Sequence, residues 1–241
     1  MKRLIVIASG SKNNAALIEN DGKTILIDCG VSLRSLNNVY KDFSLDIKDL
    51  LAVFVTHSHT DHTKYLATLQ KKLDVPFYSG ANVADVEKIT DTVCLDGFEV
   101  SPFELSHDVD CCGYKIDLSG TLFGFATDTG VITKTLLDNL ENCETVMLES
   151  NHDVDMLRFG PYTQSLKNRI LSEHGHLSNA DCAKTAVYLA QRKLEKIVLA
   201  HLSETNNSPL VAKRETFSLL QKYGFDNVEI EVAEHYLEVL L

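Results

Sequence analysis

The stretch His57-Ser58-His59-Thr60-Asp61-His62 decides the interpretation of this 241-residue chain. It follows directly on Val53-Phe54-Val55-Thr56, whose apolar and β-branched side chains predict a buried strand. Imidazoles and carboxylates are typical ligands of zinc, iron and manganese, whereas magnesium and calcium prefer oxygen ligands alone. Four such side chains crowd a single ion, but two ions about 3.5–4 Å apart can share them. The stretch therefore predicts a site for two divalent metal ions, with Zn²⁺ or Mn²⁺ as the candidates.

Three distant polar residues have one property in common, because each follows an apolar strand candidate. They are His107 after residues 103–106, Asp128 after residues 122–127, and His201 after residues 197–200. A solvated histidine-rich loop or one adventitious ion would explain the first stretch alone. It would not explain three further ligand types at strand ends, so we expect all seven side chains to converge.

The pattern of apolar segments predicts the fold class. Ten segments rich in β-branched residues predict strands, at residues 4–8, 24–28, 51–56, 102–106, 113–118, 121–127, 145–149, 197–201, 228–232 and 236–240. The clearest helices begin at Ser178, in a capping box with Asp181, and at Ser208, and weaker ones fit residues 32–40, 63–72 and 133–140. Strand runs flanked by helices predict an α/β protein of the α+β type, an αββα sandwich of two mixed β-sheets flanked by helices. No linker or repeat divides it, so we expect one domain over residues 1–241.

Composition and charge predict a cytoplasmic protein without a membrane span or a broad basic surface. The apolar run at residues 4–8 is too short for a signal peptide, and no stretch approaches a membrane span. Six cysteines without a CxxC pair are expected to be reduced thiols, so the cytoplasm is the expected location and no membrane partner is expected. The formal charge of −11 argues against a broad basic surface for nucleic acid.

A further histidine lies outside the ligand set. Gly175-His176-Leu177-Ser178 stands just before the helix that begins at Ser178, so His176 occupies a helix-entry loop. There its ring could point into the cleft and give a proton to a leaving-group oxygen. Glu149, at a strand end, could orient His176, with a purely structural hydrogen bond as the alternative.

The HxHxDH pattern of His57, His59, Asp61 and His62 resembles the signature of the metallo-β-lactamase superfamily. The resemblance spans nearly the whole chain and implies the metallo-β-lactamase fold. It also implies how the ligands divide. His57, His59 and His107 would hold one ion, Asp61, His62 and His201 would hold the other, and Asp128 would bridge both.

Longer blocks of sequence resemble one branch of this superfamily. The GH motif at His176 is similar to that of phosphodiesterases such as ribonuclease Z and PhnP-type enzymes. Blocks at residues 8–14, 148–153, 169–172, 175–179 and 200–207 resemble the bacterial YycJ/WalJ family. That resemblance implies a 5′-to-3′ exonuclease acting on DNA ends, with a metal-bridging hydroxide as nucleophile. Tyr65 departs from the family, which usually has glycine at this position.

Three alternatives to a DNA exonuclease stay open. A short, acidic chain would also suit a small-molecule or cyclic phosphodiesterase. A thioesterase or lactonase is disfavoured because His176 would have no leaving group to protonate, and a non-enzymatic regulatory protein would not need a complete ligand set. The oligomeric state is left open.

The expected roles beyond metal binding are as follows. Asp61, His176 and Glu149 are the candidate catalytic residues, because Asp61 could also take up a proton from the attacking water. Candidate substrate contacts are Asn151, His152, Ser178 and Arg169. Further phosphate contacts could come from Arg34, Lys64, Arg158 and Lys167, but no interleaving of aromatic and basic residues predicts a stacking groove. With only 72 residues between Asp128 and His201, no added substrate-binding module is expected.

Overall fold

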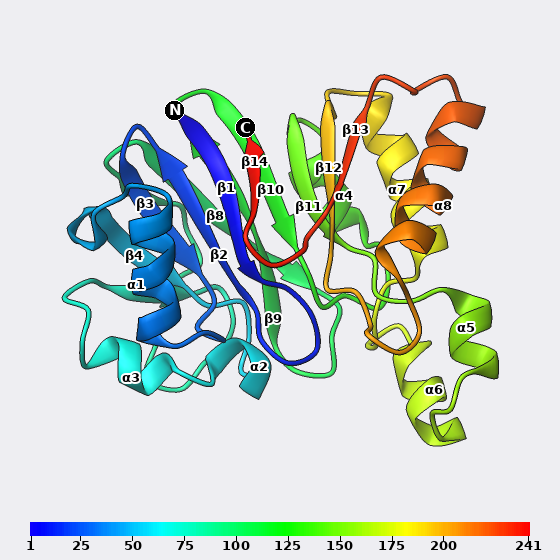
Figure 1. Ribbon diagram of the computed structural model, residues 1–241, viewed down its shortest axis with the longest axis horizontal. Helices are drawn as coiled ribbons and strands as arrows, with labels where there is room; N and C mark the ends of the chain where they lie inside the picture. Colours follow the sequence, from blue (N-terminus) through cyan, green and yellow to red (C-terminus); the bar gives the residue numbers. More distant parts are fainter.

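The computed structural model describes residues 1–241 as two seven-stranded sheets packed against each other, with helices on the outer faces (Figure 1). The first sheet has the order β14 (Leu237–Leu240), β1 (Lys2–Ala8), β2 (Ala15–Asn20), β3 (Lys23–Ile27), β4 (Leu50–Phe54), β5 (Phe77–Ser79) and β6 (Glu87–Lys88). The second has the order β13 (Glu229–Val232), β12 (Lys196–Ala200), β11 (Thr145–Glu149), β10 (Thr121–Ala126), β9 (Cys111–Leu118), β8 (Phe98–Leu105) and β7 (Val93–Leu95). Both sheets mix parallel and antiparallel pairs, so the predicted αββα sandwich is confirmed.

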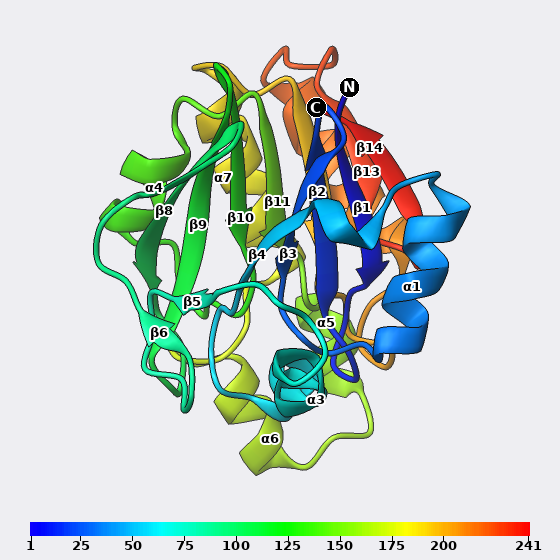
Figure 2. The ribbon, with the colours of Figure 1, turned by 90° about the vertical axis from the view of Figure 1, so that its left-hand side faces the viewer.

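Helices cover both outer faces of the sandwich. On the side of the first sheet lie α1 (Leu33–Asp42), a 3₁₀ turn (Ile47–Asp49), α2 (Thr60–Thr63) and α3 (Leu66–Gln70). On the other side lie α4 (Lys134–Leu140), α7 (Asn179–Ala190) and α8 (Pro209–Lys222). Two short helices, α5 (Val154–Phe159) and α6 (Gln164–Ile170), project beyond the body of the sandwich (Figures 1 and 2). None of the helices combines the length and the apolar composition needed to span a bilayer.

The helix starts follow from local capping. The hydroxyl of Ser178 accepts a hydrogen bond from the backbone N–H of Asp181, and that of Ser208 accepts one from Val211, as the sequence predicts. The expected helix over residues 63–72 is instead two short helices that break at Tyr65, whose ring packs against the core of the first sheet. The strands β2, β5, β6 and β7 and the helices α5 and α6 were not foreseen.

The central strands are buried on both faces, which explains their nearly continuous apolar sequences. β4, β11 and β12 carry almost only buried side chains, and a core of 40 buried residues contains side chains of both sheets and of the helices α1 and α3. The buried hydroxyl of Tyr114 in this core is paired, since it donates to the carbonyl of Val55 at 2.7 Å. This rigid core holds the strand ends in place.

The parallel pairing brings the carboxyl ends of distant strands to one edge. In the second sheet, Ala126 of β10 pairs with Leu148 of β11, and Glu149 of β11 pairs with Ala200 of β12. In the first sheet, Ile27 of β3 pairs with Phe54 of β4. The residues that follow these strands therefore meet at the same edge, where open α/β sheets commonly bind ligands.

Candidate metal centre

The loop after β4 places its ligand side chains in a cluster. His57 and His62 are fully buried with ring centroids 4.1 Å apart, while His59 lies beside His57 at 4.7 Å. The backbone of Asn14 donates to the carbonyl of Asp61 at 2.9 Å, which ties this loop to the first sheet. The short sequence pattern thus forms one compact wall of the site.

The seven predicted ligands lie together. Potential ligand atoms within 4.8 Å of one another belong to four sets: His57, His59 and His107; Asp61, His62 and His201; His57, His62 and Asp128; and Asp128, Glu149, His176 and His201. The first two sets are the divisions that the superfamily resemblance implies. Asp128 lies between them, with Oδ2 3.3 Å from Nε2 of His62 and Oδ1 4.0 Å from Nε2 of His107.

Left-handed backbone marks three of the strand ends. The φ angle is 65° at Asp28, which follows β3, and 55° at His201, which follows β12. It is 64° at Asp128, just beyond the end of β10. This conformation is uncommon for residues other than glycine, and aspartate and histidine are among the side chains that adopt it. Such strained positions cluster at functional sites, where the surrounding structure holds them.

Several buried polar atoms at the centre of the cluster have no partner within the protein. Nε2 of His57, Oδ2 of Asp128 and Nε2 of His201 are buried and make no hydrogen bond. A buried polar atom without a partner costs free energy, so this arrangement calls for a cation among these atoms. Burial and the neighbouring His62 lower the pKa of His57 to about 2, which leaves its imidazole neutral, as a metal ligand must be. The residues present therefore fit a divalent metal ion.

Behind the ligands lies a carboxylate that the sequence analysis missed. Oδ2 of Asp28 lies 2.7 Å from Nδ1 of His62, and Oδ1 accepts from the backbone and hydroxyl of Thr56 at 2.8 and 3.0 Å. This contact fixes the ring of His62 with Nε2 facing the cluster. Asp28 stands at the end of a predicted apolar strand. The pattern that indicated His107, Asp128 and His201, a polar side chain at the end of an apolar strand, therefore also indicates Asp28.

Glu149 lies under two histidines at once. Its Oε1 is 2.8 Å from Nδ1 of His176 and 2.9 Å from Nδ1 of His201, and its Oε2 accepts from the backbone N–H of Thr129 and Leu177. Burial opposes ionisation of Glu149, yet the contacts with His176 and His201 lower its pKa to about 2. The predicted contact with His176 is thus present, and the second contact with His201 was not foreseen.

His176 has its ring at the rim of the cluster. The carbonyl of Gly175 accepts from Nδ1 of His107 at 3.1 Å, so the segment before α7 lies directly against the ligands. The ring centroid of His176 is 5.3 Å from those of His107 and His201, and its side chain stays partly exposed. Although burial disfavours the charge, Glu149 and Asp128 raise the pKa of His176, which favours the protonated ring.

The four candidate substrate contacts lie in different environments. Asn151 is buried and donates to the backbone carbonyl of His201 at 2.9 Å, while the hydroxyl of Ser178 is used in the cap of α7. These bonds favour positioning roles for both residues over direct contact with substrate. His152 is also buried, and neither ring nitrogen has a hydrogen-bond partner. Arg169 alone is exposed.

Comparisons with known proteins agree with this geometry. The sequence profile of the "Beta-lactamase superfamily domain" matches residues 23–202. The chain is 33% identical to "Exodeoxyribonuclease YycJ" of Bacillus anthracis, over 91% of this chain and 89% of that one, and 30% identical to "Exodeoxyribonuclease WalJ" of Streptococcus pneumoniae, over 84% and 82%. The crystal structure of the metallo-β-lactamase fold protein YhfI from Bacillus subtilis superposes with a TM-score of 0.75, at 16% identity over 99% of this chain and 98% of that one. The chain therefore belongs to the YycJ/WalJ family within the β-lactamase superfamily.

Proposed function

We propose that this protein is a metal-dependent phosphodiester hydrolase, a 5′-to-3′ exonuclease that acts on DNA ends. The observation that carries the proposal is the pairing of His176 with Glu149 beside the metal cluster, 2.8 Å apart. A phosphodiester has a poor leaving oxygen that needs a proton, whereas the thiolate of a thioester can leave without one. The relatives named as exodeoxyribonucleases support DNA as the substrate.

The proposed cofactor is a pair of divalent ions, Zn²⁺ or Mn²⁺. His57, His59 and His107 would hold one ion, Asp61, His62 and His201 the other, and Asp128 would contact both. Two of the four sets of converging ligand atoms match the two groups of three, and another set joins Asp128 to His57 and His62. These sets and the unpartnered buried atoms support the division. When bound, the ions would make water a better nucleophile and would neutralise charge on the phosphoryl oxygens.

The residues of the chain have distinct roles in the proposed reaction. The oxygen of water attacks phosphorus, and Asp61 accepts one proton of that water at its carboxylate. As the bond from phosphorus to the leaving oxygen breaks, Nε2 of His176 gives that oxygen a proton. Glu149 holds Nδ1 of His176, which fixes the direction of Nε2, and so acts as a positioning residue.

A small-molecule or cyclic phosphodiesterase is the second candidate, favoured by the net charge of −11. Both candidate enzymes hydrolyse a phosphodiester bond. They differ in the substrate, which is a DNA end for one and a small or cyclic ester for the other. An exonuclease needs to hold only the end of a strand, so an acidic surface is compatible with it when the positive charge is concentrated at the site.

The deciding experiment uses metal-reconstituted protein with DNA and RNA oligonucleotides labelled at either end. Release of nucleotides from the 5′ end of DNA, with RNA degraded more slowly, is the expected product ladder. Bis-p-nitrophenyl phosphate and cyclic nucleotides serve as small substrates in the same buffer. Intact DNA beside rapid hydrolysis of a cyclic ester would support the second candidate instead.

We also propose that the protein acts in a bacterial cytoplasm as a single domain over residues 1–241. The bacterial sources of its relatives support the first part, as do six free cysteines of which five are buried. Gel filtration with light scattering would show the oligomeric state, for which the sequence gives no expectation.

A further inference from the structure

The helices α5 and α6 form a projection that we call the arm, defined as residues 154–171. It extends away from the sandwich below α7 and α8 in Figure 1, and Figure 2 shows it at the same end of the molecule from the side. One side chain anchors each helix inward, since Leu157 and Ile170 are buried. The side chain of Phe159, by contrast, is 86% exposed at the end of α5.

The arm is fixed to the edge of the candidate site. The backbone N–H of His176 donates to the carbonyl of Ile170 at 3.0 Å. Gly175 packs so closely that a Cβ atom there would lie 2.2 Å from the same carbonyl. Arg169 has Nε 3.5 Å from Oδ2 of Asp108, whose Oδ1 is 3.2 Å from Nε2 of His59. The last turn of α6 is therefore one side chain away from the metal cluster.

The charge of the arm is opposite to that of the whole chain. Within residues 154–171 the charged side chains are Arg158, Lys167, Arg169 and Asp155, which gives the arm a net charge of +2 in a chain of −11. Nζ of Lys167 donates to the carbonyl of Arg158 at 2.7 Å, which ties the two helices together. A basic projection with an exposed aromatic ring, next to an acidic body, is complementary to a nucleic-acid strand.

We propose that the arm binds the single-stranded end of the DNA substrate, with a base stacked on Phe159 and phosphates paired with Arg158 and Arg169. The inference rests on the proposed function, because it takes the substrate to be a DNA strand. The helix α6 has seven residues and is about 10 Å long, the length of roughly three nucleotides of a stacked strand. The arm thus contacts nucleotides beside the scissile bond and does not contact a mononucleotide ester at the metal cluster.

The test compares Phe159→Ala with Phe217→Ala, which removes an exposed ring from α8 on the body of the protein. With metal-loaded enzyme, Phe159→Ala is expected to lower kcat/KM for a 5′-phosphorylated oligonucleotide by about tenfold, since stacking on an aromatic ring contributes that much per base. Hydrolysis of bis-p-nitrophenyl phosphate is expected to stay unchanged in both variants. The melting temperature is expected to stay within about 2 °C of wild type, because the ring of Phe159 is exposed.

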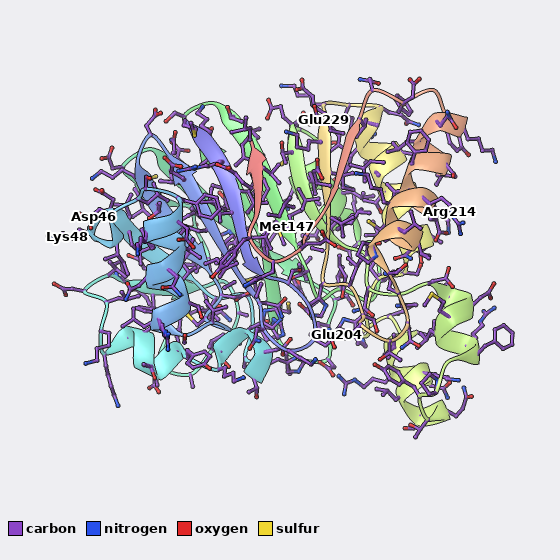
Figure 3. All side chains as sticks on the ribbon, viewed as in Figure 1. Asp46, Lys48, Met147, Glu204, Arg214 and Glu229 are labelled. Atoms are coloured by element: carbon purple, nitrogen blue, oxygen red, sulfur yellow. The ribbon has the colours of Figure 1, made fainter.

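A binding measurement tests separately whether the positive charge of the arm contributes to DNA binding. Fluorescence anisotropy with a phosphorothioate oligonucleotide, which resists cleavage, gives the affinity at several salt concentrations. Arg158→Ala is expected to make the slope of log affinity against log salt shallower by about 0.7, the contribution of one phosphate contact on a single strand. Arg214→Ala, on the outer side of α8 (Figure 3), is the matched control and is expected to leave the slope unchanged.

The outcomes separate this inference from the proposed function. If wild type degrades DNA and Phe159→Ala does so equally well, the arm is not a DNA contact, while the exonuclease proposal stands. If wild type hydrolyses the small ester and leaves DNA intact, the exonuclease proposal fails. A change in oligomeric state on Phe159→Ala, or binding of wild type to anionic vesicles in place of DNA, would overturn the inference by showing a different occupant.

Discussion

Replacing Glu149 with glutamine removes one charge and keeps the size of the side chain. In the wild type, Oε1 contacts Nδ1 of His176 and His201, and Oε2 accepts from the N–H groups of Thr129 and Leu177. All four partners therefore present hydrogen to the carboxylate. In glutamine the amide oxygen can keep the two backbone N–H groups, and the NH₂ group then faces Nδ1 of both rings, which can accept only in the tautomer that carries its proton on Nε2.

The size of the effect follows from these four contacts. The two contacts with the imidazoles lose their charged acceptor, and a hydrogen bond to a charged group contributes about 1 kcal/mol more than a neutral one. We therefore expect Glu149→Gln to lower the free energy of unfolding of the metal-free protein by roughly 1–3 kcal/mol. Because His176 and His201 lose their common acceptor, turnover of a phosphodiester or metal affinity should also fall by about 10- to 100-fold.

The matched control is Glu144→Gln at the other end of β11. Oε2 of Glu144 accepts a single hydrogen bond, from the N–H of Leu122 at 2.8 Å, and the oxygen of a glutamine can keep that bond. Its effect on the unfolding free energy should stay within about 0.5 kcal/mol. The chain has no tryptophan, so urea unfolding is best followed by circular dichroism, with turnover measured on metal-loaded protein.

The dependence on pH gives a second check. The folded pKa of Glu149 is about 2, below the usual 4.5, so its carboxylate stabilises the folded state above pH 4.5 and this contribution is lost as pH falls towards 2. The gap between wild type and Glu149→Gln should narrow over that interval. An unfolding free energy within about 0.5 kcal/mol of wild type at pH 7, together with unchanged turnover, would refute the central role of Glu149.

The other predictions concern the cluster and its surroundings. His176→Ala should lower turnover by about 10²- to 10⁴-fold with unchanged metal content, and unchanged turnover would rule out its role as proton donor. Asp28→Asn should weaken metal affinity by about 10- to 100-fold in a chelator competition, because His62 loses its charged partner; equal affinity would contradict this. Removal of metal with a chelator should lower the melting temperature, and added Zn²⁺ or Mn²⁺ should restore it. The reason is that buried atoms such as Oδ2 of Asp128 lack partners in the protein. A melting temperature that does not change with metal would contradict the proposed metal site. Burial lowers the pKa of His152 to about 4, so the unfolded chain binds more protons than the folded chain between pH 6.5 and 4. Between pH 7 and 4.5 the free energy of unfolding of wild type should therefore fall by about 2 kcal/mol more than that of His152→Gln. Parallel curves of unfolding free energy against pH would refute this prediction.

The sequence determined the sandwich and the metal cluster because both depend on short-range patterns. An apolar run followed by a polar ligand marks a strand end, and this rule located His107, Asp128 and His201 although they are far apart in the chain. Serine at a helix start is equally local, since its hydroxyl bonds to an N–H three residues on. The four missed strands include β5, β6 and β7, which have too few residues to show a period.

Only the tertiary structure decided which side chains support the ligands and which project away from the body. The contacts of Glu149 with His201 and of Asp28 with His62 join residues remote in sequence, and no pattern along the chain records such distances. The exposure of Phe159 was likewise decided only by the tertiary structure. Phenylalanine is usually buried, yet the side chain of Phe159 is 86% exposed. Strand and helix periodicity is set by neighbouring residues, whereas contact and exposure are set by the path of the whole chain.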